Sequence, residues 1–311
     1  MFLYTTNTDS DDLSVIDAKA RKELVRIPVG GSPRGPVKFD NIKMFGYVCN
    51  TAGNTLSVID QFRNREVSRI TVGQAPRGLA ISEDGKYAFV SNSGSNTISV
   101  VDILRRSQID EIGVGLNPRH MGVLPGKNSV NVCFWGSDVV VTLDYSQGIQ
   151  NIFMAKAMSV GFDARPYSVA IDSLSGRSYV ANTMADYMSI LDDNTGKELT
   201  RIPVGFGGRE AVLSPDRNYV FLSTEVTNEI AVVDLNQNQV VHRVSVGPTP
   251  RGLVLNPDLK ELFAVAFPRS PAMVGARNSV SVIDVSDPLK ASLVDAIPVG
   301  QGPCAISMLT R

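Results

Sequence analysis

Arginine recurs in a short phrase that is repeated along this sequence. The phrase reads SPRG at 32–35, APRG at 75–78, NPRH at 117–120 and TPRG at 249–252. Aligning all copies of the phrase gives six arginines: Arg34, Arg77, Arg119, Arg165, Arg209 and Arg251. Guanidinium groups bind carboxylates and phosphates in a planar, bidentate manner. Six of them brought together without carboxylates would repel one another and would favour an anionic ligand.

The same arginines have a structural interpretation, which the sequence leaves open. A guanidinium can hydrogen-bond loop carbonyl groups or pair with a carboxylate of a neighbouring repeat. Carboxylates near the phrase are few, and we expect Glu210 to contact one or more of the arginines. Asp186 and Glu225 are further candidates.

The elements that position these arginines are predicted by two more repeated phrases. One phrase resembles "LSVID" 13–17 and ends in aspartate; the other resembles "YAFVSN" 87–92. Each of the three phrases occurs in seven copies. The copies are short, rich in β-branched residues and bounded by Gly, Asn, Asp or Pro, as strands are. Four strands in each repeat of 42 to 50 residues indicate a propeller blade.

The phase of the repeat predicts how the ring closes. If the strands are called A to D from the axis outward, the chain begins on a B strand, "FLYTTN" 2–7, and ends on an A strand, "CAISML" 304–309. The last strand should therefore complete the first blade and leave no open sheet edge. We predict an all-β, seven-bladed propeller of four-stranded antiparallel blades that occupies residues 1–311 as a single domain.

The phrases "YVAN", "SVID", "PVG" and "PRG" resemble the YVTN-type seven-bladed β-propeller repeats. The resemblance covers the whole chain and implies the fold but no single function, since proteins with similar repeats include binding proteins, lyases, lactonases and haem d1-associated propellers. It implies a periplasmic or surface location. The opening residues, "MFLYTTN", lack the pattern of a signal peptide, so the compartment stays open.

Strand directions place the arginine phrase, a D-to-A connection, at one mouth of the central channel. The glycine after the arginine is replaced by other residues in four copies, and broken symmetry is where a ligand site is expected. The replacements are His120, Pro166, Glu210 and Ala305, with Tyr167 following Pro166. Trp135, the only tryptophan, stands at the end of a B strand on the same face, where it can stack on a flat ligand or pack between blades.

His120, Tyr167 and Glu210 are the candidates for catalysis at this mouth. His120 is suited to general base catalysis or to axial ligation of a tetrapyrrole, which needs one histidine. A metal site needs two or three more ligands, and the only other histidine, His242, is predicted on an outer strand. We predict no metal site and no cofactor. A nucleophile elbow and a phosphate-binding loop are missing from the sequence.

We therefore predict a binding protein whose mouth takes an anionic small molecule or an acidic segment of a partner. The alternative is a lyase- or lactonase-type enzyme that acts on a carboxylate-bearing substrate at the same mouth. A net charge of −1 and a single tryptophan argue against single-stranded nucleic acid. No apolar run is long enough to span a membrane. The long insertion 268–278 adds Arg269 and Arg277 to the same face, and nothing in the sequence indicates the oligomeric state.

Overall fold

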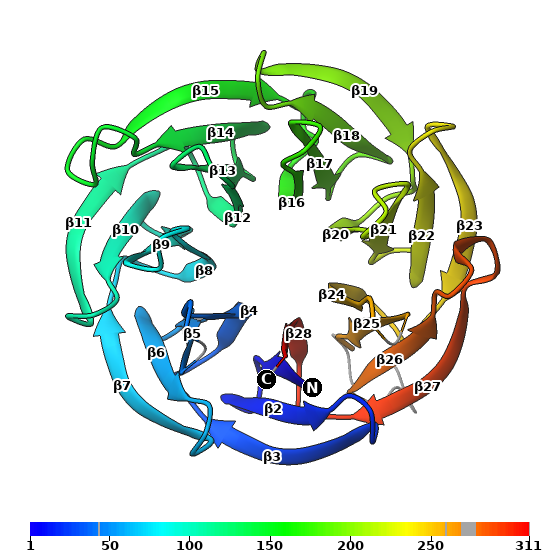
Figure 1. Cartoon of the computed structure of the whole chain (residues 1–311), viewed down its shortest axis with the longest axis horizontal. Helices are drawn as coiled ribbons and strands as arrows, with labels where there is room; N and C mark the ends of the chain where they lie inside the picture. The colour runs from blue at the N-terminus through cyan, green and yellow to red at the C-terminus, as the bar shows by residue number, and fades with distance from the viewer. Residues whose placement is uncertain (43, 259, 269–277, 311) are drawn as a thin grey trace.

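Seven four-stranded sheets surround a central channel in the computed structural model of the chain (Figure 1). The structure describes residues 1–42, 44–258, 260–268 and 278–310. The inner strands are β4 (Pro33–Phe39), β8 (Pro76–Ile81), β12 (Pro118–Leu124), β16 (Pro166–Asp172), β20 (Gly208–Leu213), β24 (Pro250–Asn256) and β28 (Pro303–Leu309). The second strands are β1 (Phe2–Asn7), β5 (Phe45–Asn50), β9 (Tyr87–Asn92), β13 (Ser129–Phe134), β17 (Arg177–Asn182), β21 (Tyr219–Thr224) and β25 (Glu261–Ala266).

The third and outer strands complete each blade. The third strands are β2 (Asp12–Asp17), β6 (Thr55–Asp60), β10 (Thr97–Asp102), β14 (Val139–Asp144), β18 (Tyr187–Asp192), β22 (Glu229–Asp234) and β26 (Ser279–Asp284). The outer strands are β3 (Lys22–Pro28), β7 (Arg65–Thr71), β11 (Ser107–Gly113), β15 (Phe153–Ser159), β19 (Lys197–Pro203), β23 (Gln239–Ser245) and β27 (Ser292–Pro298). One short 3-10 helix, η1 (Pro288–Lys290), precedes β27. No helix in the described parts of the chain is long and apolar enough to cross a membrane.

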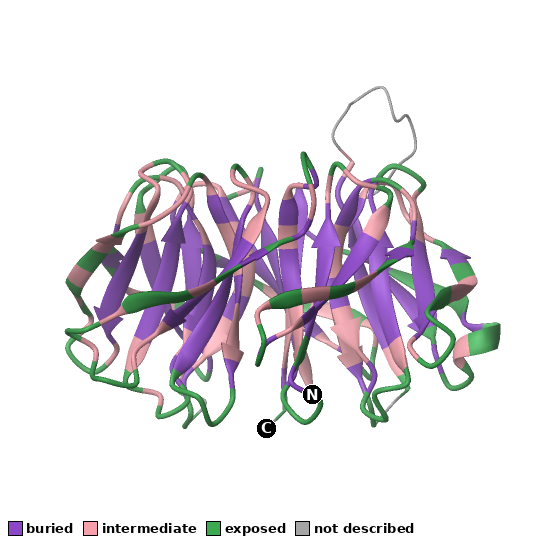
Figure 2. Ribbon diagram, turned by 90° about the horizontal axis from the view of Figure 1, so that it is seen from above, coloured by how far each residue is buried: buried purple, intermediate pink, exposed green. Residues whose placement is uncertain are grey.

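The ring closes as the repeat phase predicts. Strand β28 pairs antiparallel with β1, from Phe2 opposite Leu309 to Asn7 opposite Pro303. The blade that results has the order β28-β1-β2-β3, so its strands come from both ends of the chain. The predicted fold class is therefore confirmed. Both termini lie at the same edge of the disc (Figure 2), and we call this side the terminal face.

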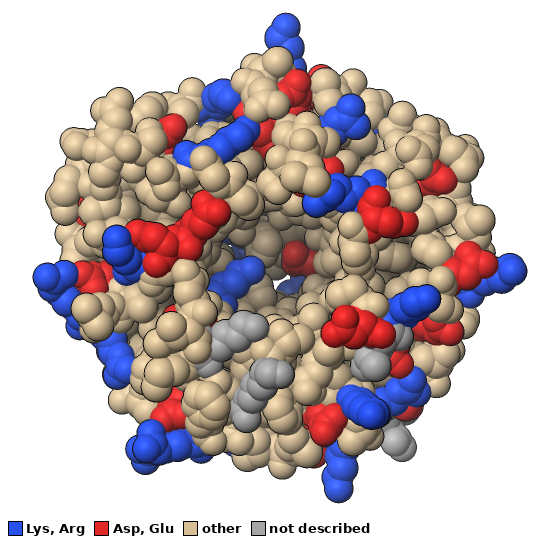
Figure 3. All heavy atoms as spheres, viewed as in Figure 1, with Lys and Arg blue, Asp and Glu red and all other residues tan. Residues whose placement is uncertain are grey.

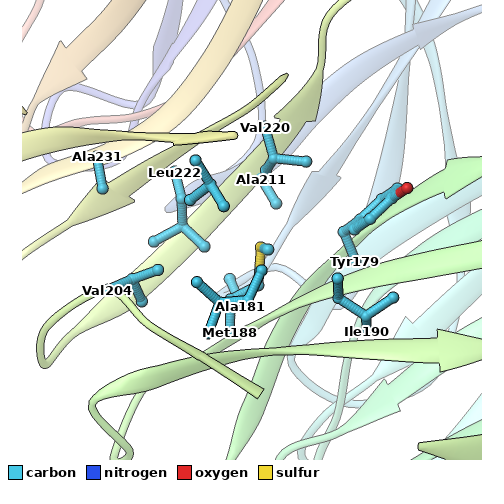
Figure 4. Close-up of a cluster of buried hydrophobic side chains, with 11 residues drawn as sticks. Tyr179, Ala181, Met188, Ile190, Val204, Ala211, Val220, Leu222 and Ala231 are labelled. Carbon is cyan, nitrogen blue, oxygen red and sulfur yellow. The ribbon is translucent and has the colours of Figure 1, made fainter. Parts of the chain in front are cut away.

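The hydrophobic core lies between neighbouring blades. Figure 4 shows one such layer, in which Tyr179, Ala181, Met188 and Ile190 of one blade face Ala211, Val220, Leu222 and Ala231 of the next. These side chains are at most 4% exposed. Close packing of this kind fixes each inner strand relative to its neighbours, which positions the groups at the channel mouth.

Side-chain hydrogen bonds fix the loops on the face opposite the termini. Asn50 donates from Nδ2 to Thr55 Oγ1 (2.9 Å) and to Ser57 Oγ (2.7 Å), and Asn92 repeats this with Thr97 and Ser99. The asparagines at the ends of the second strands thus hold the start of the third strands, as their turn-forming role predicts. We call this side, which carries the arginine phrase, the arginine face.

Candidate arginine cage at the channel mouth

Five arginines, rather than the expected six, occupy equivalent places at the start of the inner strands. Each follows the residue that opens the strand, which is Pro33, Pro76, Pro118, Gly208 or Pro250. The corresponding residues in the other two blades are Tyr167, after Pro166, and Cys304, after Pro303. We call this set the arginine ring: Arg34, Arg77, Arg119, Tyr167, Arg209, Arg251 and Cys304.

Arg165 was wrongly placed in the ring because its loop is longer. Six residues, 160–165, connect β15 to β16, whereas four residues connect β11 to β12 and β19 to β20. Arg165 consequently lies in the turn, with a positive φ of 54°, where Asn117 has 55°. Its Nε donates to Asp163 Oδ1 at 2.8 Å. Because of this shift, the residue that replaces the glycine after the arginine in this blade is Ser168, not Pro166.

The residue after each second strand packs behind the ring. In four blades this is a threonine or serine whose hydroxyl donates to a carbonyl of the next inner strand, as Ser93 does to Pro118 O at 2.6 Å. The other three blades have Trp135, Glu225 and Phe267. The Arg119 and Arg165 guanidinium carbons lie 5.1 and 4.3 Å from the centre of the Trp135 ring. Two guanidiniums therefore lie against the Trp135 ring. This arrangement favours a packing role for Trp135 rather than stacking on a flat ligand.

Glu225 pairs with two arginines on one side of the ring. Its carboxylate contacts Arg209 Nε and lies 3.4 Å from Arg251 Nη2. Arg251 also stacks on Phe267 at 4.2 Å and reaches the Cys304 sulfur from Nη1 at 3.8 Å. Burial disfavours the charge of Arg251, yet Cys304, Tyr167 and Glu225 outweigh it and raise the pKa of its guanidinium.

Arg34, Arg77 and Arg119, on the other side of the ring, form no ion pair with a carboxylate in the described ranges. Their Nε atoms are buried without a hydrogen-bond partner there. Burial and the neighbouring charges of Arg34 and Arg251 lower the pKa of Arg77. Burial and the charges of Arg77, Arg209 and Arg34 lower the pKa of Arg119 to about 10. This half of the ring therefore carries positive charge that the described side chains do not neutralise.

The ring borders a cavity of about 30 Å3, which we call the arginine cage. Arg34, Arg77, Arg119 and Arg251 line it with Tyr167 and Cys304. Burial opposes ionisation of Cys304, but Arg251 and Arg34 outweigh it and lower the pKa of the thiol. A space of this size takes a few water molecules or one small anionic group.

His120 and Glu210 lie just inside the cage, one residue further along their strands. His120 Nε2 is 3.8 Å from Glu210 Oε1, and the side chains are 13% and 16% exposed. Burial lowers the pKa of His120 to about 3, with Lys38 adding to the effect. Burial raises the pKa of Glu210 to about 8, against the opposing charge of Lys38. Contrary to expectation, Glu210 lies beside His120 as a neutral partner, and in the described structure it forms no ion pair with a ring arginine.

A second cavity, of about 820 Å3, opens on the other side of the His120–Glu210 pair, toward the terminal face. Its walls combine Lys38, His120 and Glu210 with aliphatic residues such as Ile171, Leu253 and Ile306. Figure 3 shows this face, with basic and acidic side chains visible inside the central hollow. We call this space the wide cavity.

Lys38 is the member of this group that the sequence did not reveal. Its inner strand contains one extra residue between Arg34 and Lys38, at a bulge. Lys38 therefore stands where Ala80 and Val254 stand in other blades. Burial lowers its pKa, partly offset by Glu210. The sequence feature that could have revealed Lys38 is a lysine within an inner-strand segment that is otherwise apolar.

Other expected residues lie away from the cage. His242 is on β23, where its Nε2 is 2.8 Å from the carbonyl of Ala291. Arg269 and Arg277 lie outside the described residues. Among the residues that are described, no three His, Cys, Asp or Glu side chains gather as a metal site requires.

A family comparison places this geometry among known propellers. The family model of the cytochrome D1 heme domain matches residues 2–205. The chain belongs to the cytochrome D1 heme domain family. The resemblance to YVTN-type repeats stays a prediction beside this finding. Comparison with curated proteins gives no match.

Solved structures share the fold at low sequence identity. The periplasmic gluconolactonase PpgL of Pseudomonas aeruginosa has a TM-score of 0.79 at 15% identity, covering 98% of each chain. The dihydro-heme d1 dehydrogenase NirN has a TM-score of 0.71 at 16% identity, covering 98% of this chain and 74% of its own. Hydrazine synthase of Kuenenia stuttgartiensis has 0.73 at 19% identity, covering 89% of this chain and 90% of its own.

The heme in the family's description does not fit the arginine cage. A ligand of that size needs a pocket of several hundred cubic ångströms, and the cage has about 30 Å3. The wide cavity is large enough, but no arginine is among its described lining residues. The arginines and the larger space thus lie on opposite sides of the His120–Glu210 pair.

Proposed function

We propose that the protein binds an anionic ligand through one carboxylate or small oxyanion held in the arginine cage. The observation that carries this proposal is the unneutralised half of the ring. Three guanidiniums, from Arg34, Arg77 and Arg119, share a small cavity and form no ion pair with a carboxylate in the described ranges. Glu210 also lines this cavity, but burial raises its pKa to about 8 and so favours its neutral form. Like charges in a partly buried site are costly, and an anion relieves that cost.

The cage sets the size of the group that is recognised. About 30 Å3 admits one carboxylate or a comparable anion, and the remainder of a larger ligand must lie outside the cage. Tyr167 also lines the cage. A guanidinium pairs with a planar carboxylate through two parallel hydrogen bonds, which fixes the orientation of the bound group.

Binding by isothermal titration calorimetry, with acetate, citrate and inorganic phosphate as probes, tests this proposal. Arg77→Gln and Arg119→Gln should each weaken binding of the best probe by about tenfold or more, since a charge-assisted pair contributes about 1.5–3 kcal/mol. Arg165→Gln is the matched control, because that arginine lies outside the ring and pairs with Asp163. Binding that is equally sensitive to Arg165→Gln, or no binding of any probe, would contradict the proposal.

An enzymatic function at the same site is the second candidate, favoured by the His120–Glu210 contact. Neutral His120 has a ring nitrogen that can accept a proton, although its lowered pKa makes it a weak base, and protonated Glu210 can donate a proton. For hydrolysis of a lactone that bears a carboxylate, the cage would hold the carboxylate. His120 would accept a proton from water as its oxygen bonds to the carbonyl carbon. Glu210 would protonate the ring oxygen as the carbon–oxygen bond breaks.

Turnover of a panel of carboxylate-bearing lactones distinguishes the two candidates. If the site is catalytic, His120→Ala and Glu210→Gln should each lower kcat by at least about a hundredfold, a typical share for one acid or base. Anion binding to the cage should be retained in both variants. Absence of turnover in the wild-type protein, together with calorimetric binding, leaves the binding function alone.

A further inference from the structure

Five bulky apolar side chains interrupt the otherwise polar rim of the arginine face. They are Leu116, Phe162, Met184, Phe206 and Val226, with exposed fractions of 57%, 99%, 51%, 54% and 69%. Single exposed apolar residues are ordinary on protein surfaces, but a contiguous group marks an interaction site. We call these five residues the apolar crescent.

The crescent is a departure from the repeat, not a part of it. The position of Leu116 and Phe206 in the loop before the inner strand is Gly31, Gln74, Pro248 or Gln301 in other blades. The position of Met184 and Val226 after the second strand is Asp9, Ala52, Gly94, Gly136 or Pro268 in other blades. Phe162 is carried by the longer loop that also displaces Arg165. The fold therefore does not require these side chains.

The five side chains occupy three consecutive blades, and two of them, Leu116 and Phe206, lie near the cage. The loop before each inner strand is hydrogen-bonded to a loop of that blade, as Met184 N is to Ala164 O (3.1 Å) and Glu225 N to Gly207 O (2.8 Å). Leu116 and Phe206 each precede a ring arginine, Arg119 or Arg209, by three residues. Such a segment spans at most about 11 Å when fully extended.

The charged residues on the same rim indicate which kind of partner can bind the apolar crescent. Asp9, Asp11, Asp163 and Asp186 are exposed on loops of this face. In the loops of this face that the structure describes, Arg165 is the one lysine or arginine outside the ring. Acidic side chains on the described loops of this rim repel an anionic membrane surface, so the exposed phenylalanines are poorly placed for lipid insertion. The cage, in contrast, attracts a carboxylate at the centre.

From this arrangement we infer that the arginine face docks a polypeptide that ends in an apolar segment with a free carboxylate. The carboxylate enters the cage, the apolar side chains cover the crescent, and basic residues further back meet the acidic rim. Terminal-carboxylate capture beside an apolar surface is an established mode of peptide recognition. This inference rests on the proposed anion site and names its partner.

The test uses an acetylated hexapeptide of two lysines followed by alanine, leucine, phenylalanine and leucine. It is titrated as the free acid and as the C-terminal amide, by calorimetry, into the full chain. We expect the acid to bind at least tenfold more tightly than the amide. The double variant Phe162→Ser/Phe206→Ser should weaken peptide binding by about tenfold and leave phosphate binding unchanged. Both side chains are exposed, so its melting temperature should match that of the wild type.

Leu104→Ser is the control, because Leu104 is 90% exposed in a turn on the terminal face. Equal binding of acid and amide, or full binding by the double variant, would overturn the docking inference while phosphate binding stands. If the wild-type protein does not bind phosphate, the anion site itself would be overturned instead. Binding to phosphatidylserine vesicles that the double variant abolishes would assign the crescent to a membrane surface and also overturn the inference.

Discussion

Tyr167 and Cys304 stand where the other five blades place an arginine, and they change the chemistry of the ring. Tyr167 lies between Arg119 and Arg209, with its ring centre 5.8 and 4.7 Å from their guanidinium carbons. Cys304 adds a thiol whose pKa is lowered by Arg251 and Arg34 against the effect of burial. Both residues reduce the charge repulsion among the guanidiniums. Neither provides a carboxylate for Arg34, Arg77 and Arg119.

Glu210 should make the stability of the protein fall as the pH rises. Its pKa is raised to about 8 by burial, from about 4.3 for an ordinary glutamate. The folded state therefore holds a proton that the unfolded chain releases. The stabilisation is fully present below the ordinary pKa and is lost as the pH rises through about 8. In Glu210→Gln, we expect the free energy of unfolding to decline less between about pH 5 and 8 than in the wild type.

Urea unfolding over a pH series, in buffers without carboxylate or phosphate, measures this difference. His120→Asn is the control with the opposite sign. The pKa of His120 is lowered to about 3, so its contribution is present above the ordinary pKa and is lost as the pH falls. Parallel pH profiles for the wild type and Glu210→Gln would show that Glu210 titrates normally.

At the scale of the element, the start of each inner strand depends on close contact with the next blade. A Cβ added at Gly78 would lie 2.1 Å from the backbone oxygen of Arg119. Ser91 Oγ donates to that same oxygen at 2.5 Å. Where glycine follows a ring arginine, as at Gly35 and Gly78, it is needed because the neighbouring blade's backbone packs against it, in addition to any turn preference.

Gly78→Ala should therefore destabilise the protein by about 1–3 kcal/mol, the usual cost of overpacking. The shift of the Arg119 backbone should also weaken anion binding at the cage. Gly113→Ala is the matched control, since an added Cβ at Gly113, the last residue of β11, would meet no heavy atom within 4 Å. Chemical denaturation of both variants gives the comparison, and equal stability of the two would argue against tight inter-blade contact.

The sequence predicts the strands well because each blade repeat contains β-branched runs bounded by turn-forming residues. It predicts the residues of the site less well, because identical residues in different repeats can occupy different positions in the structure. Arg165 matches the arginine phrase by eye, yet two extra loop residues move it into a turn. Contacts between blades, such as that of Glu225 with Arg251, join residues whose spacing along the chain carries no periodic signal.

For the whole molecule, the closing strand β28 connects the two ends of the chain. Ile306 and Leu309 are 3% and 1% exposed in its packing, and all of β1 pairs with it. A chain that ends at Gly302 would expose the edge of β1 and a layer of the core. We expect it to lose cooperative thermal unfolding and to aggregate, as circular dichroism and size-exclusion chromatography would report. A chain that ends at Leu309 keeps the strand and should unfold like the wild type.

The seven-fold arrangement makes the channel mouth a single site to which every blade contributes one group. Departures from the seven-fold symmetry make the mouth asymmetric. The unneutralised arginines lie on one side of it, the apolar crescent covers three blades, and the His120–Glu210 pair lies beneath. We propose above all that the cage holds an anion.

Anomalous diffraction from crystals equilibrated with bromide or selenate tests that claim most directly. We expect a peak inside the arginine cage, within contact distance of Arg34, Arg77 and Arg119, that disappears in Arg77→Gln/Arg119→Gln crystals and persists in Arg165→Gln crystals. Anomalous peaks confined to the outer surface of the wild-type protein, with none between these guanidiniums, would contradict the account.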